Sequence, residues 1–451
     1  MNVAQDASEA RGSRIEERRS VEVPEISVRP GSVPETAGRH PRRSGRPAWS
    51  RRGVLTALGA AVPALALTGC GSSADAAEGT GATATGGATA GSGATPQVRT
   101  PTVTVTPADG MKKAAFTSPV GIAVTDGTLS TVVVSGNDGS LLAGSFDAGR
   151  TRWTSTRHPY SGTKYTVTAK TDDGSEHTTS FVTKSPGETF VGRFTPEANS
   201  TSGVGMPVSI AFTHAVADRA AVEKAITVTA EPAVEIVGHW FGNTRLDFRP
   251  REYWAAGTKI TLSLRLKDVE GADGVYGVQS KDVTFRIGRR QVSTVDLAKD
   301  TMTVERDGTA VASYPVTGGD TDHTTWSGIM VISERLRQTR MESSTVGLGD
   351  EYDIADVPHA QRLTTSGTFI HGNYWAASSV FGSGNTSHGC IGLRDAKGGA
   401  DRSVPGHRFY DSSMLGDVVV VVNSGERTVE ASNGLNGWNL SWADWKAGSA
   451  L

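Results

Sequence analysis

Three side chains that can do chemistry lie within residues 369–395. They are His371, His388 and Cys390, and the chain of 451 residues has only two cysteines. A cysteine can be a small core hydrophobe, half of a disulfide, a metal ligand or a nucleophile, and each role requires different neighbours. A nucleophilic cysteine needs a base within hydrogen-bond reach and an acceptor that fixes the tautomer of that base.

The spacing of these residues favours a nucleophile. His371 ends the alternating stretch GTFIH, which predicts a strand, and Cys390 follows nineteen residues later. Gly389 permits a tight backbone approach just before the thiol. Because the loop between them is rich in Gly, Ser and Asn, the base and the thiol can meet in space. Backbone N–H groups at the Gly-Cys turn are also suitable donors for an oxyanion.

The other roles fit less well but stay open on the residues alone. A zinc site of His371, His388 and Cys390 lacks the usual second cysteine or a clear fourth ligand. An inert core cysteine is disfavoured by the glycine and polar neighbours on both sides. A disulfide would need Cys70, which the N-terminal sequence predicts to be a lipidation site. We therefore expect no metal ion and no other cofactor.

The N-terminal sequence indicates where in the cell the protein is located. Residues 1–52 contain eleven Arg and no Lys, which predicts a disordered segment. An Arg pair then precedes seventeen uncharged residues, 53–69, which are typical of an export-signal core and are followed by Cys70. The sequence LTGC resembles a bacterial lipobox, and SRRGVL resembles a twin-arginine signal, so we expect lipidation at Cys70. Residues 71–97, rich in Gly, Ala, Ser and Thr, predict a flexible linker. The protein is expected on the outer face of the membrane, facing the cell wall.

Composition indicates a mainly β protein without a polyanionic partner. Charged residues make up 20% of the chain and the net charge is −2, so the chain lacks the basic footprint that nucleic acid requires. The 54 glycines, with abundant Thr and Val, indicate short strands and turns. A chain of this length also predicts more than one domain.

Two stretches of the chain resemble each other. SPVGIAVTDG at 118–127 parallels MPVSIAFTHA at 206–215, and residues 152–169 parallel 247–264. Each pair carries an apolar alternation of period 2, which predicts strands. A unit of about 90 residues with short strands is typical of an immunoglobulin-like sandwich. We predict two such domains, at 98–187 and 188–288.

A third, β-rich domain is predicted over 289–424. It begins with a hairpin, in which 301–305 and 310–316 flank the turn Asp307-Gly308, and it ends with a buried strand over 417–423. A C-terminal subdomain follows at 425–451. Its residues Trp438, Trp442 and Trp445 have the spacing of one helical face, and we expect an aromatic clamp that packs the C-terminus back on this third domain rather than a carbohydrate-stacking surface.

His371-Gly372 followed by the box Ser387-His388-Gly389-Cys390 resembles the signature of L,D-transpeptidases with a YkuD-type catalytic domain. The resemblance extends over roughly 98–451 and is strongest to the actinobacterial, mycobacterial type. It implies that Cys390 is the nucleophile and His371 the base. It also implies that the carbonyl of Gly372 orients the imidazole of His371. Relatives often have Ser at position 372. His388 would lie beside the nucleophile, and the Gly389 and Cys390 amides would contribute to the oxyanion hole.

The same resemblance implies a set of substrate-binding residues. They comprise lid residues, a Ser-Gly strand start, the Trp four residues after the base and two positions around the nucleophile: Met341, Tyr352, Ser366, Gly367, Trp375, Ser387 and Gly392. The family box commonly has Asn at the last of these positions. The departure to Gly392 removes a side chain, and we expect it to affect donor or acceptor preference more than catalysis.

The resemblance implies an enzyme that forms 3→3 cross-links in peptidoglycan through a thioester on the cysteine. Its partners would be the tetrapeptide stems of donor and acceptor, and β-lactams of the carbapenem type would inhibit it covalently. Two alternatives remain open: an L,D-carboxypeptidase, in which water takes the acyl group, and a catalytically inactive wall-binding lipoprotein. Papain-like proteases fit less well, because their Cys precedes their His.

Overall fold

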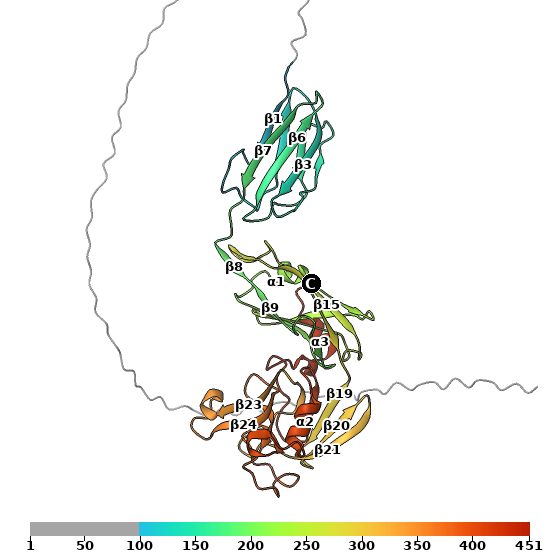
Figure 1. Cartoon of the computed structure of the whole chain (residues 1–451), viewed down its shortest axis with the longest axis vertical. Helices are drawn as coiled ribbons and strands as arrows, with labels where there is room; N and C mark the ends of the chain where they lie inside the picture. The colour runs from blue at the N-terminus through green and yellow to red at the C-terminus, as the bar shows by residue number, and fades with distance from the viewer. Residues whose placement is uncertain (1–98) are drawn as a thin grey trace, which may run out of the picture. The chain divides into compact units, whose positions relative to one another are not determined.

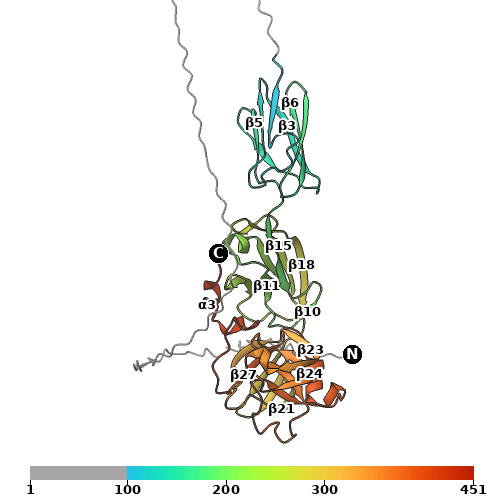
Figure 2. The ribbon, with the colours of Figure 1, turned by 90° about the vertical axis from the view of Figure 1, so that its left-hand side faces the viewer.

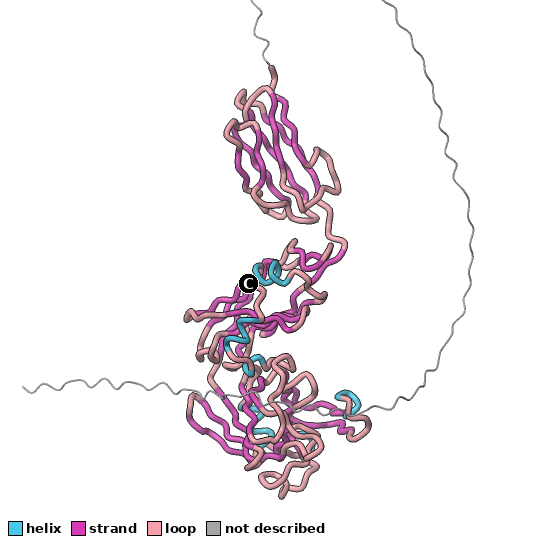
Figure 3. Tube along the Cα trace, turned by 180° about the vertical axis from the view of Figure 1, so that it is seen from behind, coloured by secondary structure: helices cyan, strands magenta, loops and turns pink. Residues whose placement is uncertain are grey.

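The computed structural model describes residues 99–451, whose regular structure is mostly strand with few short helices (Figure 3). The prediction of a mainly β protein is therefore confirmed. The predicted Arg-rich N-terminus, export signal, lipidation site at Cys70 and linker all lie outside the described residues. Within residues 99–451, no helix combines the length and apolarity needed to cross a bilayer.

Residues 102–182 form two facing antiparallel sheets (Figure 2). The first sheet has the strand order β1-β2-β5-β4 and the second β3-β6-β7. Their inward side chains make one core that contains Trp153, Tyr165 and Phe181. The strands are β1 (Thr102–Thr106), β2 (Gly121–Thr125), β3 (Leu129–Gly136), β4 (Gly144–Phe146), β5 (Arg152–Ser155), β6 (Lys164–Thr171) and β7 (Glu176–Val182).

Residues 188–287 repeat this arrangement with additions. One sheet has the order β13-β14-β11-β9, the other β10-β18-β15-β12, and a small third sheet has the order β16-β17-β8. The elements are β8 (Glu188–Phe190), β9 (Gly192–Thr195), β10 (Thr201–Ser202), β11 (Val208–Phe212), α1 (Arg219–Lys224), β12 (Ile226–Glu231), β13 (Val237–Phe241), β14 (Arg245–Arg249), β15 (Lys259–Arg265), β16 (Glu270–Ala272), β17 (Val275–Gly277) and β18 (Ser280–Ile287).

The sequence repeat corresponds to a structural repeat. Ile122 on β2 and Ile210 on β11 are fully buried, and each strand lies between two antiparallel partners. Tyr165 on β6 and Ile260 on β15 are likewise fully buried in the opposite sheet of each unit. Alternation of period 2 thus identified the inward faces correctly.

Residues 291–422 form one nine-stranded sheet, shown in yellow to red in Figure 1. Its order is β22-β27-β19-β20-β21-β26-β25-β24-β23. The strands are β19 (Gln291–Asp296), β20 (Thr301–Arg306), β21 (Thr309–Thr317), β22 (Gly328–Val331), β23 (Glu334–Glu342), β24 (Asp353–Arg362), β25 (Phe369–Asn373), β26 (Ile391–Arg394) and β27 (Val418–Val422). The helices are the 3-10 turns η1 (Ser343–Val346) and η2 (Lys397–Gly399) and the helix α2 (Pro405–Ser412).

Two predicted features of this sheet are present. β20 and β21 form an antiparallel hairpin, and its turn residues Asp307 and Gly308 have φ of 48° and 82°. Positive φ at both positions is what a two-residue hairpin turn of type I′ requires. The apolar run near the C-terminus is β27, which pairs with both β19 and β22 inside the sheet.

The Trp-rich C-terminus differs from the prediction in two ways. Trp438 lies in the 3-10 helix η3 (Gly437–Asn439) and the other two tryptophans in α3 (Trp442–Ala447), so they do not share one helix. The clamp also packs on the second immunoglobulin-like region: Trp445 Nε1 donates to the Val237 carbonyl at 2.9 Å, and its ring stacks on His239 at 4.7 Å. Sequence spacing cannot tell which of two neighbouring domains an aromatic cluster covers.

Candidate active site

His371 and Cys390 lie on adjacent parallel strands. In the register of β25 and β26, His371 is opposite Gly392, and Cys390 comes one residue before β26 begins. A parallel pair needs a crossover connection, which residues 374–390 supply. The expectation that His371 ends an alternating strand is wrong, since it is the middle residue of β25 and all five residues of that strand are buried.

The thiol of Cys390 is buried and protonated. Sγ donates a hydrogen bond to the Gly367 carbonyl oxygen at 3.6 Å. Burial raises the pKa of the Cys390 thiol to about 11, although the Phe369 amide and the Arg362 charge act in the opposite direction. Within residues 99–451 no hydrogen bond joins Sγ to His371, so the resting site is not a thiolate–imidazolium pair.

His371 is held as a neutral base. Its Nδ1 lies 3.0 Å from the Gly372 carbonyl oxygen, which can only accept, so the proton is on Nδ1 and Nε2 is free to take another. Burial lowers the pKa of His371, while the Gly372 carbonyl and the Asp395 carboxylate act against it. Trp375 stacks on the ring, with centroids 5.7 Å apart and planes 15° apart.

The turn that carries Cys390 is fixed by the side chain of one of its own residues. Ser387 Oγ donates to the Cys390 carbonyl at 2.6 Å. Gly389 has φ of +97°, a conformation that L side chains rarely adopt, whereas a Cβ there would meet no atom closer than 3.6 Å. Glycine is therefore required at 389 for backbone conformation rather than for space.

A cavity of about 510 Å³ opens over the thiol and the imidazole. Seven of the sequence-predicted residues line it: Met341, Tyr352, His371, Trp375, Ser387, His388 and Cys390. Met341 and Tyr352 flank η1 in a segment over 341–352, here called the lid segment. The Tyr352 ring lies 4.9 Å from that of His388, and burial raises the pKa of the Tyr352 hydroxyl.

Ser366 and Gly367 form the turn before β25, and this turn packs against the lid segment. Gly367 has φ of +106°, and a Cβ there would lie 2.3 Å from Val346 Cγ1, so η1 packs directly on this glycine. Asn433 of the C-terminal subdomain accepts from the Ser366 amide at 3.0 Å and donates to Ser366 Oγ at 2.8 Å. Asn433 of the C-terminal subdomain thus holds the turn whose Gly367 carbonyl accepts the hydrogen bond from the Cys390 thiol.

Comparisons with known proteins show to which family the chain belongs. The family profile of the L,D-transpeptidase catalytic domain (YkuD) matches residues 290–421, and that of the bacterial Ig domain matches 111–270. L,D-transpeptidase 2 of Mycobacterium tuberculosis is 30% identical over 356 residues, which cover 78% of this chain and 85% of that protein. The chain belongs to the L,D-transpeptidase family. Membership in this cell-wall-acting family implies an extracytoplasmic location.

The chain is also similar to two further proteins. L,D-transpeptidase 5 of M. tuberculosis is 30% identical over 362 residues, covering 78% of this chain and 77% of that protein. The solved structure of the LD transpeptidase LdtMt1 in complex with imipenem is 25% identical, covers 52% of this chain and all of that one, and has a TM-score of 0.44.

Two sequence-predicted residues of this L,D-transpeptidase lie inside the sheet rather than in the cavity wall. A Cβ on Gly392 would lie 2.8 Å from Thr317 Cγ2, so the position is packed by its neighbours. A Cβ on Gly372 would lie 2.2 Å from Asp395 Oδ2. Asp395 pairs with His359 at 2.7 Å, and this buried pair takes the space that a serine at 372 would need.

Sequence reasoning missed several cavity residues of the transpeptidase site. Five of them line the cavity wall: Ile354, Asn373, Ala376, Val380 and Thr386. Alternation along β25 could have identified Asn373, which lies two residues after His371 on the same face. The loop residues carry no such signal. His371, His388 and Cys390 do not form a group of possible metal ligands in residues 99–451. The possible ligands that lie close to His388 are His323 and Glu351.

Proposed function

We propose that this L,D-transpeptidase forms 3→3 cross-links between peptidoglycan stems through a thioester on Cys390. The observation that carries the proposal is the single cavity that both a neutral His371 and the Cys390 thiol line in an L,D-transpeptidase catalytic domain. Trp375, which lines the cavity, is 43% exposed, so the cavity reaches the surface and an extended peptide stem can enter it.

In the acylation step, His371 Nε2 takes the thiol proton as Sγ attacks the carbonyl carbon of the third residue of the donor stem. The amides of Gly389 and Cys390 stabilise the oxyanion of the tetrahedral intermediate. Collapse breaks the bond to D-Ala, whose amine leaves with the proton held by His371. Because both groups start neutral, proton transfer accompanies attack rather than preceding it.

In the second step, the side-chain amine of an acceptor stem attacks the thioester carbonyl. Its proton passes to His371 Nε2 and then to the departing thiolate, which restores the resting enzyme. Met341, Tyr352 and Trp375 line the cavity around the donor and would position it. Carbapenems would acylate the same thiol and stop the cycle. Lipidation at Cys70 would hold the catalytic domain on the outer face of the membrane.

The test is incubation of the purified chain with disaccharide-tetrapeptide, followed by mass spectrometry of the products. Cross-linked dimers, absent with Cys390→Ala, are expected. Tripeptide without dimers would replace the proposal with an L,D-carboxypeptidase. Absence of product, together with absence of a carbapenem adduct on Cys390, would indicate an inactive wall-binding protein.

A further inference from the structure

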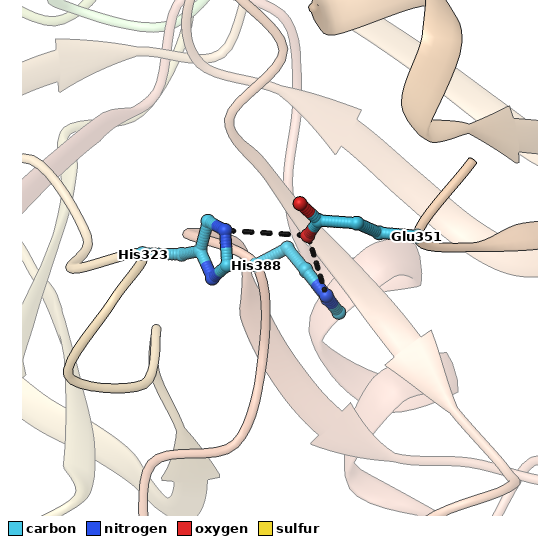
Figure 4. Close-up of side chains that lie close together, drawn as sticks. All are labelled: His323, Glu351 and His388. Atoms are coloured by element: carbon cyan, nitrogen blue, oxygen red, sulfur yellow. Dashed lines mark ion pairs between the residues drawn. The ribbon is translucent and has the colours of Figure 1, made fainter. Parts of the chain in front are cut away.

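Three ligand-type side chains converge beside the catalytic cavity (Figure 4). Glu351 Oε2 lies 3.3 Å from His323 Nε2 and 3.3 Å from His388 Nε2. His323 comes from the loop between β21 and β22, Glu351 from the lid segment and His388 from the turn before β26. The three ligand atoms lie within 4.8 Å of one another.

Two of the three separations in this group fit a tetrahedral metal centre, and the third, between the two imidazole nitrogens, is within 4.8 Å. Zinc bonds of about 2.0–2.1 Å place neighbouring tetrahedral ligand atoms about 3.3 Å apart, and both carboxylate–imidazole separations match that edge. Two imidazoles and one carboxylate are a ligand set used by zinc sites that keep an open position. The side chains of His323, Glu351 and His388 are 24%, 42% and 32% exposed, so an ion can enter from solvent.

A carboxylate behind His323 orients that ligand. Asp320 Oδ1 lies 3.1 Å from His323 Nδ1 and also accepts from the His323 amide at 2.8 Å. Nδ1 therefore donates to the carboxylate, which leaves the lone pair of Nε2 facing Glu351. A carboxylate on the far nitrogen of a ligating imidazole is the usual outer-shell arrangement of metal-binding histidines.

The two histidines belong to one hydrogen-bonded unit. The Asp320 amide donates to the Ser387 carbonyl at 2.8 Å, and the Ser387 amide donates to the Gly318 carbonyl at 2.9 Å. Glu351, by contrast, comes from the lid segment and precedes Tyr352, which lines the cavity. An ion held by all three side chains would join the lid segment to the turn of the nucleophile.

We propose that His323, Glu351 and His388 form a site for a zinc-class divalent metal ion, with water as the fourth ligand, that clasps the lid segment over the cavity of Cys390. The competing arrangement is a hydrogen-bonded His–Glu–His group that holds no ion. The clasp slows entry of an acyl donor, and this consequence alone rests on the proposed function. Binding of the ion itself does not depend on it.

The test is titration of the untagged chain carrying Cys70→Ser with Zn²⁺ by calorimetry and with Co²⁺ by visible absorption. One equivalent and four-coordinate Co²⁺ bands are expected. His323→Ala and Glu351→Gln should each weaken binding by at least about tenfold, and Asp320→Asn by roughly tenfold. His214→Ala, an exposed histidine of the second immunoglobulin-like region, is the matched control and should leave binding unchanged.

Cys390→Ala separates this site from metal capture by the catalytic thiol. Unchanged affinity in Cys390→Ala supports the proposal, whereas loss of binding there, or equal affinity in the His323→Ala and Glu351→Gln variants, overturns it. In a second measurement, Zn²⁺ should slow carbapenem acylation of Cys390 in the parent chain but not in His323→Ala. Equal slowing in both would overturn the clasp. Failure to cross-link stems would leave the titration result intact.

Discussion

Cys390 Sγ donates its hydrogen bond to the carbonyl of Gly367 and not to His371. Gly367 belongs to the turn that precedes β25, so the thiol is hydrogen-bonded to this turn and not to the imidazole. A carbonyl acceptor stabilises the protonated thiol and not the thiolate. The resting enzyme therefore stores its nucleophile in the neutral form, and donor binding must bring thiol and imidazole together.

The pH dependence of thiol reactivity follows from this neutral resting state. With the pKa of the Cys390 thiol raised to about 11, the thiolate fraction at pH 7 is small and increases about tenfold for each pH unit. In a Cys70→Ser chain with EDTA, the rate of iodoacetamide alkylation should rise steadily from pH 7 to 10. A plateau beginning below pH 7 would instead reveal a thiolate–imidazolium pair. Alkylation is followed by intact mass.

Gly372 is expected to resist replacement by the serine that relatives often carry. A Cβ at 372 would lie 2.2 Å from Asp395 Oδ2 and 2.7 Å from Asp395 Cβ. Gly372→Ser should therefore lower the free energy of unfolding by about 1–3 kcal/mol, measured by denaturant unfolding. Gly187→Ser, at an exposed glycine with no atom near its Cβ position, is the control and should change little.

Asp395→Ala removes the carboxylate that lies 2.2 Å from the Cβ position of residue 372, but it also removes the buried partner of His359. Each single substitution should destabilise, whereas the double variant should lose less than the sum of the two, because only the contact at 2.7 Å with the Cβ of residue 395 then remains. Additive losses would contradict a direct contact between positions 372 and 395.

Asn433 is expected to position the nucleophile from a distance. Its side chain accepts from the Ser366 amide and from Thr365 Oγ1, which fixes the turn that presents the Gly367 carbonyl. Asn433→Ala should slow carbapenem acylation of Cys390 roughly tenfold, which corresponds to about 1.4 kcal/mol. Asn137→Ala removes a similar bond, to the Lys164 amide, in the first immunoglobulin-like region. An equal effect of both variants on acylation would show that Asn433 acts only through stability.

The repeated units and the cavity that His371 and Cys390 share were predictable because their signals are local. Period-2 alternation identified Ile122 and Ile210 as core residues, and a glycine-flanked cysteine following a histidine predicted that these two side chains lie in one site. The direction of β26 beside β25 carries no local signal, because parallel pairing is decided by the long connection between the strands. For the same reason, the sequence does not predict that side chains on both faces of β25, the strand of His371, are buried.

The neighbours of the site depend on contacts between segments that are distant in sequence. His323 reaches His388 only because the loop after β21 is hydrogen-bonded to residues 386 and 387. At Gly392, where the sequence predicts a missing side chain, Thr317 Cγ2 would lie 2.8 Å from a Cβ. A single sequence gives the type of residue at such a position and not the atoms that surround it.

Arg249 is expected to be the main anchor of the C-terminal subdomain. It is 2% exposed, its guanidinium lies 4.3 Å from the Trp445 ring and 4.6 Å from the Trp438 ring, and Nη2 donates to the Leu440 carbonyl. Arg249→Ala should lower the free energy of unfolding by about 2–4 kcal/mol, because desolvated cation–π contacts and hydrogen bonds to buried carbonyls are lost together. Denaturant unfolding followed by tryptophan fluorescence measures the loss. Arg251→Ala, at an arginine whose side chain is 72% exposed, serves as control. If both variants unfold at the same denaturant concentration, the clamp is held by its tryptophans alone.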